Sequence, residues 1–146
     1  MEQTYAIELK NITKRFGKIV ANDGINLKVK RGEILSLLGE NGSGKTTLMN
    51  MISGIYFPDE GHILVDGKAV SIRSPKDSFD LGIGMIHQHF KLIDVMTAAE
   101  NIILGLKGNA VLDMKKVHKD IQELVDRYGF DLDPAQKVYT MSVSQK

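Results

Sequence analysis

The chain has 146 residues, 42% hydrophobic and 25% charged, with a formal net charge of +1 from 19 basic and 18 acidic residues. Its length and composition indicate one soluble globular domain, and the small net charge argues against a broad nucleic-acid-binding or membrane-binding surface. The absence of cysteine excludes a disulfide scaffold and a thiolate metal site, and the absence of a signal peptide or of about 18 consecutive apolar residues favours a cytoplasmic protein.

The first third of the chain is predicted to be rich in strands. Residues 5–9 ("YAIEL") and 25–30 ("INLKVK") alternate apolar and polar side chains, as half-buried strands do. The run "EILSLLG", residues 33–39, is almost continuously apolar, which predicts a parallel strand covered on both faces. A helix over residues 45–53 ("KTTLMNMIS") is expected to end at Gly54.

The middle of the chain adds a hairpin, a short helix and another strand. Residues 62–67 predict a strand that ends in an Asp-Gly turn, with a return strand over residues 68–72. Ser74 is a helix cap followed by proline, so a short helix is expected over residues 75–81. The apolar stretch "IGMIHQ", residues 83–88, predicts a second compact strand.

From residue 89 onward the pattern is helical. Thr97 and Glu100 form a capping box at the start of a helix. Between Asp113 and Gly129 four apolar residues follow helical spacing and predict one buried face. These four are Val117, Ile121, Leu124 and Tyr128. We therefore expect a β-rich part over residues 1–88 and a helical part over residues 89–146, in an α/β fold.

The stretch "GENGSGKTT", residues 39–47, matches the phosphate-loop pattern G-x-x-x-x-G-K-[ST] in full. Small residues let successive backbone N–H groups turn toward an anion, and the following helix adds its N-terminal dipole. Lys45 can reach the β- and γ-phosphates of a nucleotide, and the Thr46 hydroxyl can bind Mg²⁺. A GTPase would also need an Asn-Lys-x-Asp motif, which the sequence lacks.

Two further residues are candidates on weaker grounds. Phe16 lies about twenty residues before the loop and can either stack on a purine or pack at a strand end. Gln88 follows a predicted strand, where it can either complete a Mg²⁺ shell or simply face solvent. His87 and His89 flank Gln88, but without a third ligand they do not predict a metal site.

In this order, the motifs resemble the ATP-binding domain of ATP-binding cassette (ABC) transporters. "KRFG" is similar to the adenine-stacking segment, "GENGSGKT" to the Walker A loop, and "HQHFKLIDVMTAAENIILG" to the Q-loop and the start of the helical subdomain. "MSVSQ", residues 141–145, resembles a diverged signature sequence. The spelling of the Q-loop and signature is closest to importers of simple sugars and nucleosides, with the nucleoside type favoured.

The resemblance implies a P-loop NTPase cassette: an antiparallel β subdomain, part of a parallel core, and a helical subdomain. It implies ATP and Mg²⁺ as cofactors, with Lys45 and Gln88 as catalytic residues and Thr46 and Gln88 serving the metal and the attacking water. The nucleotide would be contacted by Phe16, Gly39, Glu40, Asn41, Gly42, Ser43, Gly44, Lys45, Thr46, Thr47, Ser142, Val143, Ser144 and Gln145. The implied partners are transmembrane permease subunits and a second cassette, at the cytoplasmic face of the membrane, with no nucleic acid.

Two departures from the family pattern affect what the chain is expected to do. Val143 and Ser144 replace two glycines of the signature, and valine hinders close backbone approach. No strand ending in Asp-Glu, the family's Walker B element, occurs in the sequence. We therefore expect an N-terminal fragment that binds nucleotide phosphates and is inactive by itself.

Two other hypotheses remain open from the sequence. The chain can belong to a non-transport ABC ATPase that acts on nucleic acid or ribosomes, although no basic stripe with aromatic residues supports this. It can also act without catalysis, as an interaction surface formed by residues 89–146.

Overall fold

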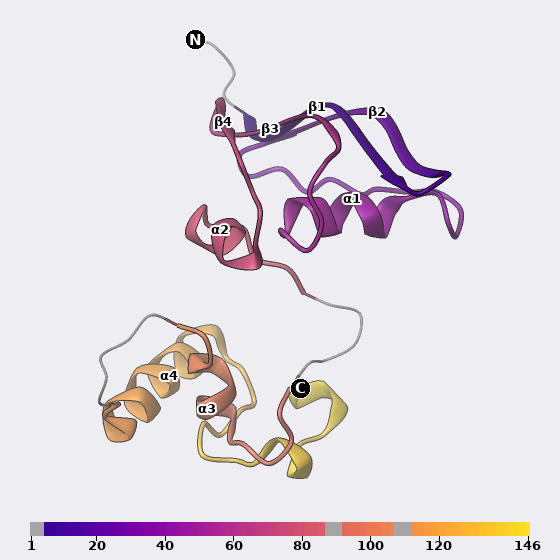
Figure 1. The fold of residues 1–146 in the computed structure, drawn as a ribbon. Helices are drawn as coiled ribbons and strands as arrows, with labels where there is room; N and C mark the ends of the chain where they lie inside the picture. The colour runs from indigo at the N-terminus through magenta and orange to yellow at the C-terminus, as the bar shows by residue number, and fades with distance from the viewer. Residues whose placement is uncertain (1–4, 87–91, 107–111) are drawn as a thin grey trace. The chain divides into compact units, whose positions relative to one another are not determined.

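The computed structural model describes residues 5–86, 92–106 and 112–146 (Figure 1). The chain divides into two compact units, Met1–Ile86 and His87–Lys146, each described by itself below. None of the helices in the described ranges combines the length and the apolar character needed to cross a membrane.

The first unit contains a four-stranded antiparallel sheet in the order β2-β1-β3-β4. Its strands are β1 (Tyr5–Phe16), β2 (Ile19–Lys30), β3 (Glu60–Val65) and β4 (Lys68–Val70). The β3–β4 hairpin confirms the strand and return strand predicted around the Asp-Gly turn. The first two strands are longer than predicted. In β1, charged residues between positions 10 and 16 hide the alternation while forming cross-strand ion pairs such as Arg15–Glu60.

A β-bulge in β1 determines which side chains enter the core. Asn11 has φ of 51°, and the register of β1 shifts between Leu9 and Ile12 against β2. The extra residue brings Leu9 and Ile12, three positions apart, to the same face of the sheet. The Asn26 side chain stabilises the bulge, because Asn11 N donates to Asn26 Oδ1 at 3.0 Å and Asn26 Nδ2 donates to Asn11 Oδ1 at 3.1 Å.

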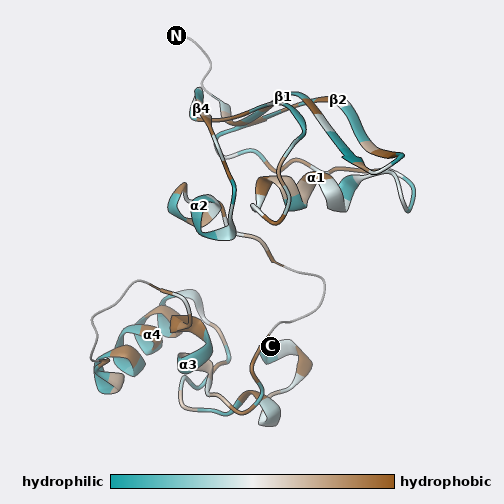
Figure 2. Cartoon of the chain, viewed as in Figure 1, coloured by the Kyte–Doolittle hydropathy of each residue, from teal (hydrophilic) through white to brown (hydrophobic). Residues whose placement is uncertain are grey.

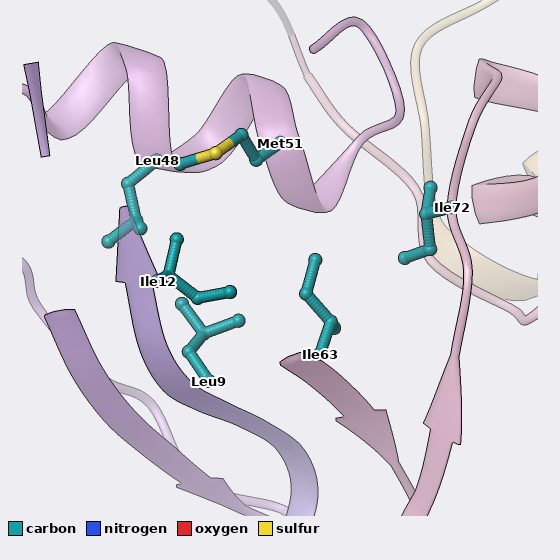
Figure 3. Close-up of a cluster of buried hydrophobic side chains, with 6 residues drawn as sticks. All are labelled: Leu9, Ile12, Leu48, Met51, Ile63 and Ile72. Atoms are coloured by element: carbon teal, nitrogen blue, oxygen red, sulfur yellow. The ribbon is translucent and has the colours of Figure 1, made fainter. Parts of the chain in front are cut away.

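Helix α1 (Lys45–Ile52) packs on this face of the sheet (Figure 3). Leu48 and Met51 point from α1 toward Leu9 and Ile12 of β1. Ile63 of β3 and Ile72, which follows β4, complete the buried cluster. Burying apolar side chains of this size stabilises a fold by roughly 1.5–3 kcal/mol each. The core therefore holds α1 against the sheet, and the glycine-rich loop leads into the first residue of this helix.

The predicted helix starts are also found. Helix α2 (Pro75–Asp80) is capped by Ser74, whose hydroxyl accepts from Asp77 N, and helix α3 (Ala98–Ile103) has the complete Thr97–Glu100 capping box. Helix α4 (Met114–Tyr128) begins after Asp113 and ends at Gly129 in the left-handed conformation. Two short 3₁₀ helices follow, η1 (Val138–Thr140) and η2 (Val143–Gln145).

The buried face of α4 differs from the predicted one. Ile121 and Val125 are buried against Ala99, and Val117 packs beside them. Leu124 and Tyr128 are instead 48% and 64% exposed, so the stripe follows i, i+4, i+8 rather than i, i+4, i+7, i+11. Figure 2 shows polar and apolar residues alternating around α4. The sequence of α4 allows an apolar face through Val125 as well as one through Leu124. Packing against the small side chain of Ala99 selects the face that contains Val125.

The two predicted compact apolar strands, of which the first was expected to be parallel, are not formed in the described residues. Residues 33–40 contain no strand, and Ile34 and Leu38 are 96% and 89% exposed. Residues 83–86 contain none either, and Ile86 is 94% exposed. A strand exists only where a neighbour completes its hydrogen-bond ladder, and no described segment pairs with either run. The α/β fold is confirmed, but its described sheet is wholly antiparallel.

Candidate phosphate-binding site

The glycine-rich loop leads directly into the N-terminus of α1. Gly44 is the N-cap residue, with φ of 86° and no side chain to cap the helix. Its carbonyl accepts from Leu48 N at 2.9 Å, which closes the first turn. The N–H groups of this turn have no side-chain cap, and the turn contains no acidic residue. An uncapped N-terminus of this kind presents N–H donors and a positive dipole end to an anion.

The Lys45 side chain folds back over the loop. Its Nζ donates to the carbonyl oxygens of Gly39 and Glu40, both at 2.7 Å, and lies 3.3 Å from Ser43 Oγ. These partners are neutral loop groups. Because a charged acceptor forms a stronger hydrogen bond with an ammonium than a neutral carbonyl does, phosphate oxygens can compete for Lys45 from this position.

Two glycines are required by close contacts. A Cβ on Gly44 would lie 2.2 Å from Ala21 O, and one on Gly39 would lie 2.8 Å from Ser43 Oγ and 3.7 Å from Lys45 Nζ. The first contact joins the loop to β2. The contacts at Gly39 show that a side chain there would collide with Ser43, on the side of the loop where the Lys45 ammonium lies. The loop residues therefore fit a phosphate group.

The Thr46 side chain is exposed, and within the described part of the chain its hydroxyl makes no hydrogen bond. It is free to bind a cation that accompanies the phosphates. Glu40 and Asn41 at the loop tip are also exposed, and Thr47 is half-buried. Among the described residues no three His, Asp or Glu side chains gather into a metal site of their own. A Mg²⁺ ion at Thr46 would thus depend on phosphate oxygens and water for its other ligands.

The sheet register brings Phe16 to the same end of the unit as the loop. Phe16 pairs with Ile19 and Lys14 pairs with Asn22 across the β1–β2 hairpin. Asn22 Nδ2 donates to Gly44 O at 3.3 Å, so the point where β2 meets the loop lies two residues along β1 from Phe16. Phe16 is 42% exposed as a residue, and its ring makes an edge contact with Tyr56.

The other predicted site residues do not belong to the described part of the first unit. Ser142, Val143, Ser144 and Gln145 belong to the second unit, where Ser142 and Gln145 form a capping box around η2. Val143 is 81% exposed. Gln88, with His87 and His89 beside it, lies outside the described residues.

Sequence reasoning missed four residues around the loop and Phe16. Asn22 is 5% exposed, contacts Gly44, and keeps its Oδ1 buried without a hydrogen bond in the described structure. Tyr56 and Lys14 contact the Phe16 ring, and Asp59 holds the Lys14 ammonium. No local pattern in the sequence marks Asn22, Tyr56 or Asp59, because each acts through a contact with a residue far along the chain. Lys14 lies two residues before Phe16 in β1, but its role also depends on the distant Asp59.

The family model described as ABC transporter matches residues 22–146. The chain is 51% identical over 144 residues to the guanosine import ATP-binding protein NupO of Bacillus subtilis strain 168, covering 97% of this chain and 28% of NupO. It is 49% identical over 148 residues to the nucleoside import ATP-binding protein NupA of Lactococcus lactis subsp. cremoris, covering 100% of this chain and 29% of NupA.

Among solved structures, the ADP conformation of MJ1267, an ATP-binding cassette of an ABC transporter, superposes with a TM-score of 0.81. The sequence identity is 25%, and the match covers 97% of this chain and 60% of MJ1267. The chain thus spans under a third of the length of the two curated relatives and about three-fifths of this cassette.

Proposed function

The chain belongs to the ABC transporter family, and from that membership we propose that it is part of the ATP-binding subunit of a solute importer. The observation that carries the proposal is the loop at the start of α1, with its uncapped N–H groups and with Lys45 Nζ 2.7 Å from two loop carbonyls. In the importer, ATP binding and hydrolysis would be coupled to solute uptake.

The proposed roles follow from the position of each group. Residues 39–47 would bind the phosphates of ATP through backbone N–H groups, and Lys45 would neutralise their charge as its loop carbonyls are released. Thr46 would contribute its hydroxyl to Mg²⁺, with Gln88 as a further ligand and as the residue that orients water. Mg²⁺ would neutralise charge on the phosphates during hydrolysis. Ser142 to Gln145 would contact the nucleotide bound by an opposing cassette.

The names of the relatives support a choice of solute. NupO is a guanosine import protein and NupA a nucleoside import protein. We therefore propose a nucleoside as the solute, with a simple sugar as the second candidate. These names favour import over an ATPase that acts on nucleic acid. The same names imply permease subunits as partners and a place at the cytoplasmic face of the membrane.

The relatives' length supports a further partner. This chain corresponds to 28–29% of NupO and NupA, which leaves room in such a polypeptide for a second cassette. We propose that this cassette supplies the opposing half of the ATP site. The chain by itself is then expected to show no Mg²⁺-dependent ATPase activity above background.

The decisive experiment replaces the loop ammonium in the complete gene product. Lys45→Ala removes the group that neutralises the phosphates, and we expect the ATPase rate to fall by about 100-fold or more. Steady-state phosphate release measures this. Lys68→Ala, at the exposed start of β4, removes the same charge away from the loop and should leave the rate unchanged. Equal rates in wild type and Lys45→Ala would refute the proposed role of the loop.

A further inference from the structure

The ring of Phe16 is surrounded by side chains that restrict its orientation. The Tyr56 ring meets it edge-on, with centroids 5.2 Å apart and planes inclined by 71°. The Lys14 ammonium lies 5.5 Å from the Phe16 centroid and 5.2 Å from the Phe57 centroid. Phe16 is nevertheless 42% exposed, so part of the ring remains accessible. Two independent contacts thus orient an aromatic ring that is not itself in the core.

The Lys14 cation is in turn fixed by Asp59. Lys14 Nζ lies 2.9 Å from Asp59 Oδ1, while Arg15 N donates to Asp59 Oδ2 at 2.6 Å. Asp59 N donates to Thr13 O at 2.9 Å, which joins the loop before β3 to β1. The backbone N–H of Arg15 and the Lys14 ammonium hold the pKa of the Asp59 carboxyl below its ordinary value. Both carboxylate oxygens are therefore engaged, and Asp59 stays charged beside Lys14.

The Lys14–Asp59 ion pair is more buried than an ordinary surface ion pair. The Lys14 side chain is only 11% exposed, and taking a cation out of water is costly unless its partners are well placed. Such pairs are weak evidence for stability, since apolar side chains of similar size often serve as well. What an apolar residue at position 14 could not do is attract the faces of two rings at once.

We infer that Tyr56 and Lys14 are positioning residues that hold Phe16 ready to stack on the purine of the nucleotide bound by the loop. The inference rests on the proposed function, which supplies the nucleotide. The hairpin register supports it, because Phe16 lies two residues from Lys14, and Lys14 pairs with Asn22, the residue that contacts the loop at Gly44. A ring that is already oriented loses less conformational freedom when the base binds.

The test compares two ligands that share phosphates but differ in the base. Affinities for ATP and for inorganic tripolyphosphate are measured by calorimetry in the complete gene product. Tyr56→Ala and Lys14→Met should each weaken ATP binding by about three- to tenfold and leave tripolyphosphate binding unchanged, because only ATP uses the ring. Tyr56→Phe keeps the edge contact and should restore ATP affinity.

A matched control exists in the same sheet. Lys28 also lies over an aromatic ring, 5.0 Å from the centroid of Tyr5, and also pairs with a carboxylate, Glu8 Oε1 at 2.9 Å. Lys28→Met therefore removes an equivalent set of contacts away from the loop and should leave both affinities unchanged. Phe79→Ala, which removes an exposed ring on α2, is the control for Tyr56→Ala.

The outcomes separate this inference from the proposed function. Unchanged ATP affinity in Tyr56→Ala and Lys14→Met would overturn the inference, and so would an equal loss for both ligands, which would indicate general damage to the loop. Phe16→Ala is the reference variant: if it leaves the preference for ATP over tripolyphosphate unchanged, Phe16 is not the base contact and the inference fails while phosphate binding stands. A wild-type protein that binds neither ligand would refute the proposed function itself.

Discussion

Gly44 meets two separate demands at one residue. Its φ of 86° is in the left-handed region, and a Cβ would lie 2.2 Å from Ala21 O in β2. The first demand adds backbone strain for any side chain, and the second blocks the approach of the loop to the sheet. The contact with β2 is what places the loop at the end of the β1–β2 hairpin.

We therefore expect Gly44→Ala to lower the free energy of unfolding by about 2 kcal/mol and to weaken ATP binding. Gly67→Ala is the matched control, since Gly67 has φ of 75° but nothing within 4 Å of the added Cβ. It should cost about 1 kcal/mol from strain and leave ATP affinity unchanged. Urea unfolding and calorimetry of the complete gene product measure both quantities. Equal effects of the two substitutions would show that the contact with Ala21 is unimportant.

At the scale of single elements, the N-terminus of α3 is stabilised by a complete capping box. Thr97 N donates to Glu100 Oε2 at 2.6 Å, and Glu100 N donates to Thr97 Oγ1 at 3.1 Å. The Thr97 N–H is the main reason why the pKa of Glu100 lies below its ordinary value of 4.5, and Lys137 also contributes. The charged form of Glu100 is therefore stabilised in the folded helix.

This shift predicts how α3 responds to acid. Because the folded pKa is the lower one, the contribution of Glu100 is fully present above pH 4.5 and is lost as pH falls through the folded pKa. Amide hydrogen exchange should show α3 opening more readily at about pH 3 than at neutral pH. Glu100→Gln keeps an acceptor for Thr97 N but cannot ionise, so this dependence should become flatter.

Glu123→Gln provides the control for that experiment. Glu123 is exposed on α4, and among the described residues its carboxylate has one ion-pair partner, Lys119 at 3.9 Å. Its substitution should leave the pH dependence of α3 unchanged. If Glu100→Gln and wild type respond identically to acid, the capping box does not contribute the expected charge effect.

At the scale of the whole molecule, the apolar residues before the loop lack a neighbouring strand that would bury them in the described structure. Ile34 and Leu38 are almost fully exposed, and Leu35 and Leu37 are about 40% exposed. A run of this composition is typical of a strand buried on both faces. The chain spans under a third of its curated relatives, so further segments of such a polypeptide are candidates for the neighbouring strands.

We expect residues 33–38 to become a strand in the complete gene product. Their amide hydrogens should exchange slowly there, because ladder hydrogen bonds protect them, and rapidly in the 146-residue chain. Mass spectrometry of the two polypeptides measures the difference. Residues 60–65 of β3, which are already paired, serve as the internal reference in both. Rapid exchange of residues 33–38 in the complete protein would contradict the expectation.

The sequence by itself was enough for features that depend on neighbouring residues. The loop of residues 39–47, the cap at Ser74, the Thr97–Glu100 box and the glycine end of α4 were all predicted, because each is built by residues a few positions apart. The β3–β4 hairpin was predicted for the same reason. The family could be recognised from the order of such motifs.

Tertiary structure decided what depends on residues far apart in the chain. It selected Val125 over Leu124 for the buried face of α4, placed a bulge at Asn11, brought Asn22 to Gly44, and set Tyr56 against Phe16. It also left residues 33–38 unpaired, although their composition is that of a strand. The reason is physical: a cap or a tight turn supplies its own hydrogen-bond partners, whereas a strand, a packed face or an oriented ring requires a partner that folding must first bring near.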